Sequence, residues 1–339
     1  MDARSLYFTE PRTVEVRERE VPDPGDGEVL VRAERSVVSP GTEMLVYRGE
    51  APAELAADEE LDALSGTFEF PFRYGYAVVG RVAATGPGVD PSWRDRRVFG
   101  FNPHESHFVA DPSNLVPVPG DRTDAEAALL PNAETAVNFA LDARPRVGER
   151  VAVFGQGLVG LLTTAVLADF PLASLRTTDC YETRRAMSTA LGADESVAPA
   201  RDDAVERLRG DGEHGADGVD LAVELSGDPA ALDRAIDATG FDGRVVVGSW
   251  YGTKRADLDL GGRFHRSRIE LVSSQVSTVD PELRGRWTSE RRIETAWDRI
   301  ARTDVDPLIT HRMPIEDAAE AYRLLDETPG EAIGVLLTY

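Results

Sequence analysis

The sequence predicts an α/β protein of two domains, in which a small β-barrel precedes a doubly wound parallel sheet. The 339 residues are enough for two hydrophobic cores. The first 120 residues contain short β-prone runs separated by glycine and proline, a pattern typical of a small barrel. From residue 123 onward, strands and helical segments alternate, which predicts a parallel sheet covered by helices. A glycine-rich motif lies where the first strand of this alternation meets its helix.

The barrel strands are expected to be short. We place them at residues 12–19, 29–33, 77–84, 97–101 and 106–109. Val14 and Val16 alternate with polar residues, so both should face the same side of the first strand. Residues 50–66 are acidic and rich in alanine, which predicts a surface helix or a loop.

The second domain begins with a helix-start signal. Thr123 is followed three residues later by Glu126, which is the spacing of a capping box. A helix around 135–143 should follow. We then expect strands at 151–154, 174–178, 219–223 and 244–247, helices at 158–169, 182–191 and 229–238, and an edge strand at 269–273. Helices near 289–302 and 315–325 and a strand at 334–337 complete the chain.

The glycine motif predicts a dinucleotide site. It reads Gly155-Gln156-Gly157-Leu158-Val159-Gly160, follows four β-prone residues and opens an apolar helical segment. Gly155 permits a tight turn, Gly157 lets the backbone approach a pyrophosphate, and Gly160 lets the helix pack closely. The free N–H groups at the helix start then face the phosphates. We therefore expect all six residues to bind the cofactor.

An acid at the end of the next strand indicates which dinucleotide is bound. Asp179 lies 24 residues (179 − 155) after Gly155, close to the roughly 20 expected of a ribose-binding acid. A carboxylate accepts both ribose hydroxyls and repels a 2′-phosphate, which favours NAD(H) over NADP(H). Arg184 and Arg185 follow closely, and a phosphate contact from them keeps NADP(H) open. The alternative for both arginines is a solvated helix face.

Composition excludes several classes of partner. The formal net charge is −23, from 60 acidic and 37 basic residues, and Lys254 is the only lysine. Such a surface disfavours nucleic acid and anionic membranes. High acidic charge with little lysine predicts a halophilic protein, in which salt screens self-repulsion; an ordinary acidic enzyme is the alternative. Without a signal-peptide pattern or a long apolar run, we expect a cytoplasmic location. The single Cys180 excludes an intrachain disulfide and a cysteine-built zinc site.

Four arginines gather around Trp287 in the segment after the sheet. They are Arg284, Arg286, Arg291 and Arg292. Such a cluster either grips an anionic substrate or forms ion pairs with surface acids. The acidic composition favours the ion pairs.

The order of a barrel, a nucleotide-binding domain and a C-terminal return resembles the medium-chain dehydrogenase/reductase superfamily along essentially the whole chain. The matching segments are 41–43, 47–49, 75, 79–82, 145–151, 155–160, 191–194, 243–248 and 307–311. The resemblance implies a GroES-like catalytic domain, residues 1–134 and 287–339, and a Rossmann domain, residues 135–286. Within the superfamily, the chain is most similar to the bacteriochlorophyllide dehydrogenase-like group, through 70–77, 131–136, 249–252, 261–267 and 273–276. A pigment substrate does not follow from this similarity.

The resemblance also raises the question of zinc. Zinc-dependent alcohol dehydrogenases of the superfamily hold their metal with a cysteine before Gly-Thr/Ser-Asp and a histidine in Gly-His-Glu. Pro40 and Tyr76 occupy these places here; proline cannot coordinate zinc and tyrosine is a rare ligand. The cysteines of the structural zinc lobe are missing as well. We expect no zinc or other metal, and interpret His104 and His107 as surface or cleft histidines.

The superfamily pattern implies further cofactor contacts at the carboxyl ends of two strands, where such sheets bind ligands. Ser226 and Gly227 follow one strand. Gly248, Ser249 and Trp250 follow the next. Thr135 begins the helix that lies under the nicotinamide in the superfamily and is expected to contact it.

Without zinc, another group must supply a proton or polarise the substrate oxygen. Thr42 matches the superfamily's proton-relay hydroxyl, and Tyr76 is placed to donate its phenolic proton. Glu43, His104 and Glu134 are further acid–base candidates. The structural alternatives are a turn residue for Thr42, packing for Tyr76 and a helix N-terminal acid for Glu134.

These observations predict a zinc-independent NAD(P)(H)-dependent oxidoreductase that interconverts a small-molecule alcohol and a carbonyl. The alternatives are a quinone or enone reductase and a non-catalytic dinucleotide-binding protein. Because superfamily members pair edge strands of the nucleotide domain, we expect a homodimer formed through residues 268–273.

Overall fold

The computed structural model describes residues 1–57, 62–210 and 217–339. The chain divides into two compact units, one of residues 1–131 and 304–339, the other of residues 132–303. We expected residues 287–303 to join the first unit. Helix α8 (Ser289–Arg302) is grouped with the second unit, where its buried Arg292 pairs with Glu134.

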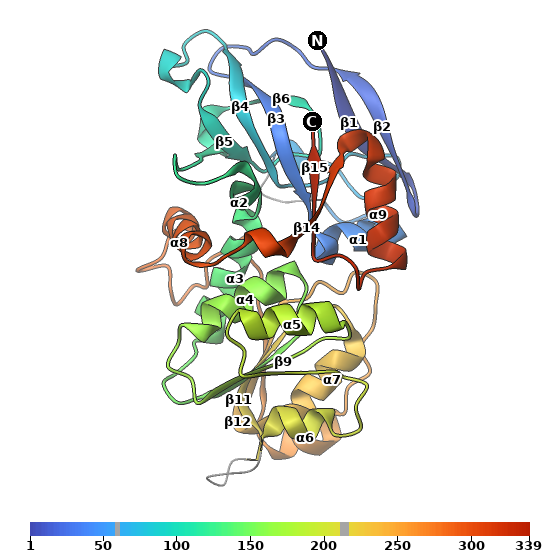
Figure 1. Cartoon of the computed structure of the whole chain (residues 1–339), viewed down its shortest axis with the longest axis vertical. Coiled ribbons are helices and arrows are strands. Elements are labelled where there is room, and N and C mark those ends of the chain that lie inside the picture. The colour runs from blue at the N-terminus through green and yellow to red at the C-terminus, as the bar shows by residue number, and fades with distance from the viewer. Residues whose placement is uncertain (58–61, 211–216) are drawn as a thin grey trace. The chain divides into compact units, whose positions relative to one another are not determined.

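Antiparallel strands dominate the first unit (Figure 1). β1 (Asp2–Glu10) and β2 (Thr13–Glu20) form a hairpin. Among the described residues a second sheet runs in the order β14-β15-β3-β4-β5-β7, with β6 paired to β3. Its strands are β3 (Val29–Val38), β4 (Val78–Thr85), β5 (Arg97–Gly100), β6 (His107–Ala110), β7 (Leu115–Pro117), β14 (Ile309–Pro314) and β15 (Gly334–Thr338). The five barrel strands expected from the sequence are present, whereas β1, β7 and β14 were not foreseen.

Alternation along β3 builds the core of this sheet. Val29, Val31 and Ala33 point to one side and pack with Val78 and Phe108 of neighbouring strands. A two-residue period puts every second side chain on the same face, so these small β-prone residues form a continuous buried row.

Short helices join the strands of the first unit. α1 (Pro40–Arg48) follows β3 directly, with Pro40 at its first turn. α2 (Asp124–Ala128) begins with the expected capping box between Thr123 and Glu126. α9 (Ala318–Glu327) lies near the C-terminus. Part of the acidic segment 50–66, residues 58–61, lies outside the described residues, and a 3₁₀ turn follows at Asp62–Leu64.

The second unit contains a parallel sheet in the order β10-β9-β8-β11-β12-β13 among the described residues. The strands are β8 (Arg150–Phe154), β9 (Ser174–Thr178), β10 (Glu195–Val197), β11 (Val219–Glu224), β12 (Thr239–Val247) and β13 (Glu270–Ser273). The helices are α3 (Leu130–Ala143), α4 (Leu158–Ala168), α5 (Glu182–Ala190), α6 (Ala204–Arg209), α7 (Pro229–Ala238) and α8. The predicted alternation is confirmed, with β10 and α6 as additions.

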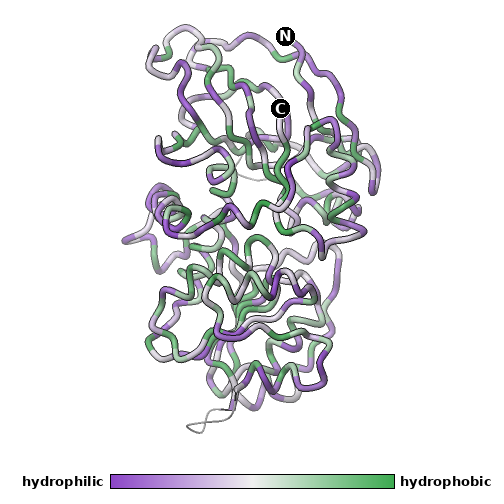
Figure 2. The backbone as a smooth tube through the Cα atoms, viewed as in Figure 1, coloured by the Kyte–Doolittle hydropathy of each residue, from purple (hydrophilic) through white to green (hydrophobic). Residues whose placement is uncertain are grey.

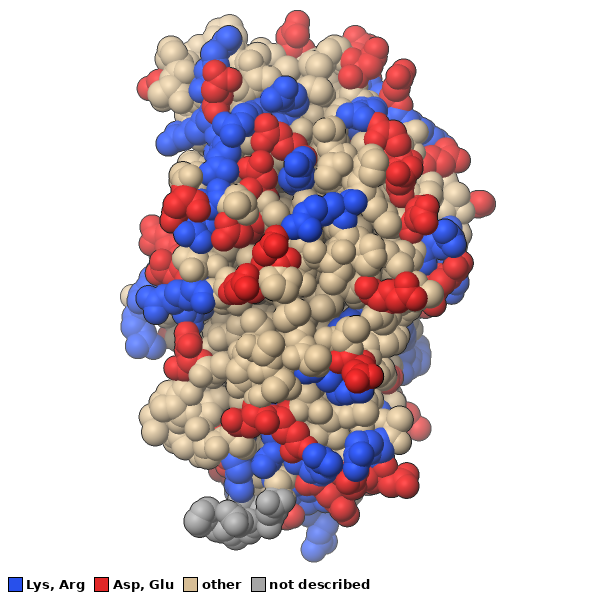
Figure 3. Space-filling view, in the orientation of Figure 1, with Lys and Arg blue, Asp and Glu red and all other residues tan. Residues whose placement is uncertain are grey.

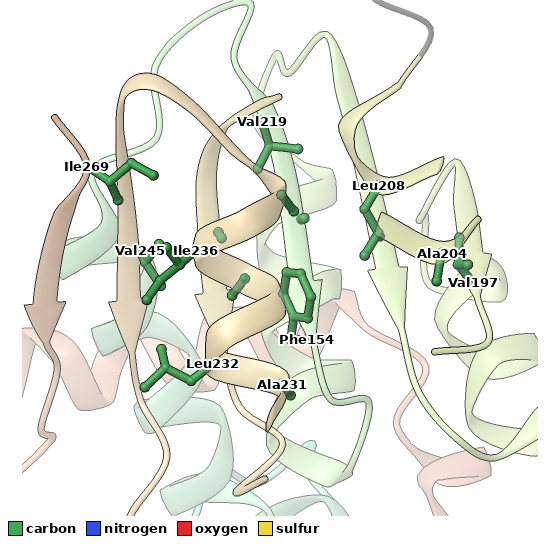
Figure 4. Close-up of a cluster of buried hydrophobic side chains, with 14 residues drawn as sticks. Phe154, Val197, Ala204, Leu208, Val219, Ala231, Leu232, Ile236, Val245 and Ile269 are labelled. Atoms are coloured by element: carbon green, nitrogen blue, oxygen red, sulfur yellow. The ribbon is translucent and has the colours of Figure 1, made fainter. Parts of the chain in front are cut away.

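Apolar side chains cover the sheet of the second unit on one face. Leu232 and Ile236 of α7 pack against Phe154, Val219 and Val245 of three strands (Figure 4). The strands of the sheet are mostly hydrophobic, whereas the turns that join them are more hydrophilic (Figure 2). No described helix is long and apolar enough to cross a membrane.

Candidate functional site

The glycine turn has the geometry that the motif predicts. Gly155 has φ of 92°, and a Cβ there would lie 2.6 Å from the Ser226 backbone. A Cβ on Gly160 would lie 2.0 Å from the Gly155 carbonyl oxygen, so the first turn of α4 packs on the glycine turn itself. Gly157 caps α4, and a Cβ on it would meet nothing within 4 Å. The turn therefore exposes backbone N–H groups at a helix start, where an anion binds well.

Asp179 is tied to this turn. Its Oδ2 accepts the N–H of Gln156 at 2.7 Å, and its Oδ1 accepts the N–H of Tyr181 at 2.8 Å. The side chain of Gln156 turns inward, where its oxygen accepts the Thr164 hydroxyl at 2.9 Å. Of the remaining motif residues, Leu158 is buried and Val159 is half-buried. Gln156 and Leu158 therefore offer a ligand their backbone rather than their side chains.

The two arginines after β9 differ in their surroundings. Arg185 donates from Nη1 to the carbonyl oxygens of Asp179 and Cys180, at 2.8 and 2.9 Å. The Arg184 guanidinium stacks over the Tyr181 ring, 4.8 Å from its centroid. Both arginines thus lie on the segment that carries Asp179.

A buried carboxylate that sequence reasoning missed organises the end of β11. Glu224 is fully buried, and its Oε1 accepts the Ser226 N–H at 2.7 Å as well as the Ser226 hydroxyl. Its Oε2 accepts the hydroxyl of Tyr251, and burial together with this charge raises the Tyr251 pKa far above its ordinary value. The signal available in the sequence was an acid directly after the apolar run 221–223.

The predicted residues after β11 and β12 contact each other. The Gly227 N–H donates to the Ser249 hydroxyl at 2.9 Å. A Cβ on Gly248 would lie 2.5 Å from the ring of Phe139, so this glycine permits close packing on α3. Trp250 is half-buried, as is Thr135 in the first turns of α3. The carboxyl ends of β8, β9, β11 and β12 thus bring most of the predicted cofactor residues to one edge of the sheet.

In the first unit, the first turn of α1 brings polar groups together. Ser39 is the N-cap, and its N–H donates to Glu43 Oε1 at 2.7 Å. The Tyr76 hydroxyl donates to the Ser39 hydroxyl. Burial raises the pKa of Tyr76 to about 12; the charge of Glu43 adds to this, while the Ser39 and Thr42 hydroxyls oppose it. Tyr76 is therefore a protonated donor at neutral pH.

Behind this turn lies a buried carboxylate–histidine pair. His104 Nε2 lies 3.0 Å from Glu43 Oε2, and neither side chain is exposed. His104 Nδ1 lies 2.8 Å from the Ser36 hydroxyl, which lies 2.8 Å from the Tyr339 hydroxyl. The Tyr322 hydroxyl also donates to Glu43 Oε2. Neither Tyr322 nor Tyr339 has a local motif that would have revealed it.

Glu134 has a different environment from the other acid–base candidates. It lies on α3 in the second unit, where Arg292 donates to it from Nε and from Nη2, both at 2.9 Å. Arg292 also donates to the Asn138 side-chain oxygen at 2.8 Å. Burial raises the pKa of Glu134, with the Arg292 charge acting against it. Of the four arginines predicted around Trp287, Arg292 thus forms a buried ion pair, and Arg291 stacks on the indole.

The side chains at the places of the superfamily's zinc ligands do not fit a zinc ion. Pro40 has no donor atom, and the Tyr76 hydroxyl is protonated and hydrogen-bonded. Both ring nitrogens of the nearby His104 are in hydrogen bonds, as are both oxygens of Glu43. Within residues 1–57, 62–210 and 217–339, no group of three histidine, cysteine or acidic residues is suited to a metal.

The fold and the glycine turn define a protein with a dinucleotide-binding domain. Comparison with known proteins shows what the chain is similar to. Residues 159–298 match the family model of zinc-binding dehydrogenases.

Curated relatives and solved structures are similar to this chain over essentially its whole length. D-guloside 3-dehydrogenase of Escherichia coli K12 is 22% identical, covering 99% of this chain and all of the relative. A short chain alcohol dehydrogenase from E. coli CFT073, solved with NADH, has a TM-score of 0.79 at 19% identity, covering 100% of this chain and 99% of that one. A zinc-binding dehydrogenase from Sinorhizobium meliloti 1021, solved with NADP, has a TM-score of 0.79 at 17% identity and full coverage of both. The predicted two-domain architecture, GroES-like plus Rossmann, is confirmed.

Proposed function

We propose that the protein is a nicotinamide-dependent oxidoreductase that interconverts an alcohol and a carbonyl on a small molecule. The observation that carries this proposal is the glycine turn whose Gln156 N–H is held by Asp179 at 2.7 Å. The similarity to D-guloside 3-dehydrogenase and to structures solved with NADH or NADP supports it. The bound nicotinamide would supply or accept the hydride, while the protein aligns the substrate and moves the proton.

We propose NAD(H) as the preferred cofactor. The residues that would hold it are the glycine turn at 155–160, Asp179, Arg184, Ser226, Gly227, Thr135 and residues 248–250. Asp179 supports the preference because its carboxylate is fixed beside the glycine turn, where a 2′-phosphate would meet its charge. Arg184 and Arg185 are the features that favour NADP(H).

A fluorescence titration with NADH and NADPH tests this proposal. Trp250 should transfer energy to bound reduced nicotinamide, with micromolar affinity and tighter binding of NADH. Asp179→Asn should weaken NADH binding about tenfold and bring the two affinities together. Asp169→Asn, which removes an exposed partner of Arg299, is the matched control and should change neither affinity. Tighter binding of NADPH would indicate that Arg184 and Arg185, rather than Asp179, set the cofactor preference. Binding of neither cofactor would contradict the enzyme proposal.

We propose that no zinc takes part in the reaction. Pro40 and Tyr76 support this, because they replace the two ligands that zinc-dependent relatives need. Turnover should survive dialysis against a strong chelator without loss, with metal content measured on the same sample. Loss of turnover that zinc restores would contradict the proposal.

We propose Tyr76 as the proton donor to the substrate oxygen, with Thr42 as its relay partner. The supporting observations are its raised pKa of about 12 and its hydrogen bond to Ser39. Glu43 and His104 would act behind it, and the ion pair with Arg292 favours a structural role for Glu134. Tyr76→Phe should lower kcat about a hundredfold, as expected for loss of a general acid, with cofactor binding unchanged. Unchanged turnover would remove Tyr76 from the mechanism.

The same assays discriminate the alternatives. Turnover of enones but not of alcohols or carbonyls would favour a quinone or enone reductase. Cofactor binding without turnover of any substrate class would favour a non-catalytic dinucleotide-binding protein.

We also propose a homodimer. β13 is the edge of the described parallel sheet, and its Leu271 is 40% exposed, which supports pairing with a second copy. Light scattering should give twice the 36.9 kDa of one chain. A mass near that of one chain at high salt would contradict it.

A further inference from the structure

The polar cluster of the first unit forms one connected set of hydrogen bonds. If Glu43 is a carboxylate, the His104 Nε2 must carry the proton that joins them at 3.0 Å. In a neutral ring Nδ1 then accepts the Ser36 hydroxyl at 2.8 Å, and Ser36 in turn accepts the Tyr339 hydroxyl at 2.8 Å. Every proton in this series of hydrogen bonds has an acceptor, so a single tautomer of His104 satisfies all of them.

Glu43 connects the cluster to Tyr76, the proposed proton donor, through Ser39. Its Oε1 accepts the Ser39 N–H at 2.7 Å, and the Ser39 hydroxyl accepts Tyr76. Its Oε2 is held from the other side by His104 and by Tyr322. The Glu43 carboxylate therefore connects His104 and Tyr322, which hold it, to Ser39, which orients the Tyr76 phenol.

Tyr322 reaches this cluster from a distant part of the chain. It lies on α9, 279 positions after Glu43 in sequence, and its side chain is fully buried. The Phe8 ring packs edge-on against it at 5.3 Å, and the Tyr47 ring lies 5.4 Å away. With its ring held on two sides, the hydroxyl has little freedom and directs one strong donor at a fully buried carboxylate.

We propose that Tyr322 is a positioning residue for Tyr76 and acts through Glu43 and Ser39. The inference rests on the proposed role of Tyr76 as proton donor. Without the Tyr322 hydroxyl, Glu43 Oε2 keeps only its contact with His104, so the carboxylate is held less firmly against the Ser39 N–H. Ser39 in turn holds the Tyr76 phenol less firmly in one direction. Tyr322 lies behind Glu43 and Ser39, so its loss should affect the rate of proton transfer rather than cofactor or substrate binding.

The test is a double-mutant cycle with Tyr76→Phe and Tyr322→Phe. Tyr322→Phe keeps the ring that packs on Phe8 and Tyr47 and removes only the hydroxyl. It should lower kcat about tenfold, with KM for substrate and cofactor within about twofold of wild type. Because Tyr322 acts through Tyr76, the double variant should be no slower than Tyr76→Phe alone. Tyr47→Phe, which removes a neighbouring phenol outside the set, is the matched control and should leave kcat unchanged.

A second measurement reports on the cluster without turnover. In a protein labelled with ¹⁵N-histidine, the Nε2 signal of His104 should shift in Tyr322→Phe and stay in place in Tyr47→Phe. His104→Asn assigns the signal.

The outcomes separate this inference from the proposed function. If Tyr76→Phe lowers kcat but Tyr322→Phe keeps the wild-type kcat, Tyr322 has no positioning role, while Tyr76 remains the proposed proton donor. Losses that add in the double variant would overturn it as well, since Tyr322 would then act independently of Tyr76. A fully active Tyr76→Phe would overturn the donor and the positioning role together.

Discussion

Gly75 is the residue with the least tolerance for change in the polar cluster. Its φ is 109°, and a Cβ there would lie 2.5 Å from the ring of His104. That ring is fully buried and hydrogen-bonded at both nitrogens, so it cannot shift to make room. The glycine in the superfamily-like Gly75-Tyr76 segment is thus required by the histidine beside it.

We predict that Gly75→Ala is strongly destabilising. The positive φ and the clash together should lower the free energy of unfolding by about 3 kcal/mol. Gly148→Ala is the matched control, because Gly148 has φ of 78° but a Cβ there meets nothing within 4 Å. Its free energy of unfolding should fall only by the strain of the positive φ, about 1 kcal/mol. Thermal unfolding of both variants measures the difference, and equal losses would contradict a role for the His104 contact.

At the scale of elements, Arg244 links β12 to Glu149, which directly precedes β8, and to the end of α3. It donates to both oxygens of Glu149 at 2.8 and 2.7 Å, and to the Ala143 carbonyl at 2.7 Å. Burial alone would raise the pKa of Glu149, but hydrogen bonds from Arg244 and from the Arg146 N–H outweigh it, so the pKa is lowered. A depressed carboxyl pKa contributes stability above the unfolded value and loses it as pH falls through the folded one.

We therefore predict a pH-dependent effect of Glu149→Gln. The variant should melt about 3 °C below wild type at pH 7, and this gap should close as pH falls below the ordinary value of 4.5. Asp203→Asn, which breaks an exposed pair with Arg201, is the control and should not change the melting temperature measurably. A gap that stays constant as pH falls well below 4.5 would show that the charge of Glu149 is not its source.

For the whole molecule, the dominant quantity is the net charge of −23. Acidic and basic side chains are interspersed on the surface seen in Figure 3, and many arginines form ion pairs such as Arg207–Glu195 and Arg12–Asp326. Local pairing does not remove the excess of acids, so self-repulsion should destabilise the folded chain at low ionic strength.

We predict that the melting temperature rises when KCl is increased from about 0.1 M to molar concentration, because the Debye length falls from about 10 Å to about 3 Å. Sucrose at equal osmolality is the control, since it does not screen charge. A rise of the same size in sucrose, or no rise in KCl, would contradict both the screening argument and the halophilic interpretation.

The sequence by itself determined the features that depend on neighbouring residues. The glycine turn at 155–160, the capping box at Thr123 and the alternation of strands and helices were all predicted, because backbone conformation and periodicity are local properties. Asp179 was found in the same way, as an acid at a fixed spacing from Gly155.

Only the tertiary structure decided which side chains act together. Glu43 and His104 were candidates as separate residues, but their pairing and the contact with Tyr322 join segments far apart in the chain. Glu134 shared their chemistry in the sequence, yet it lies in the other unit and pairs with Arg292. Glu224 and Tyr251 were missed for the same reason. A buried polar group needs a partner, and packing across the sheet, which no local pattern records, chooses that partner.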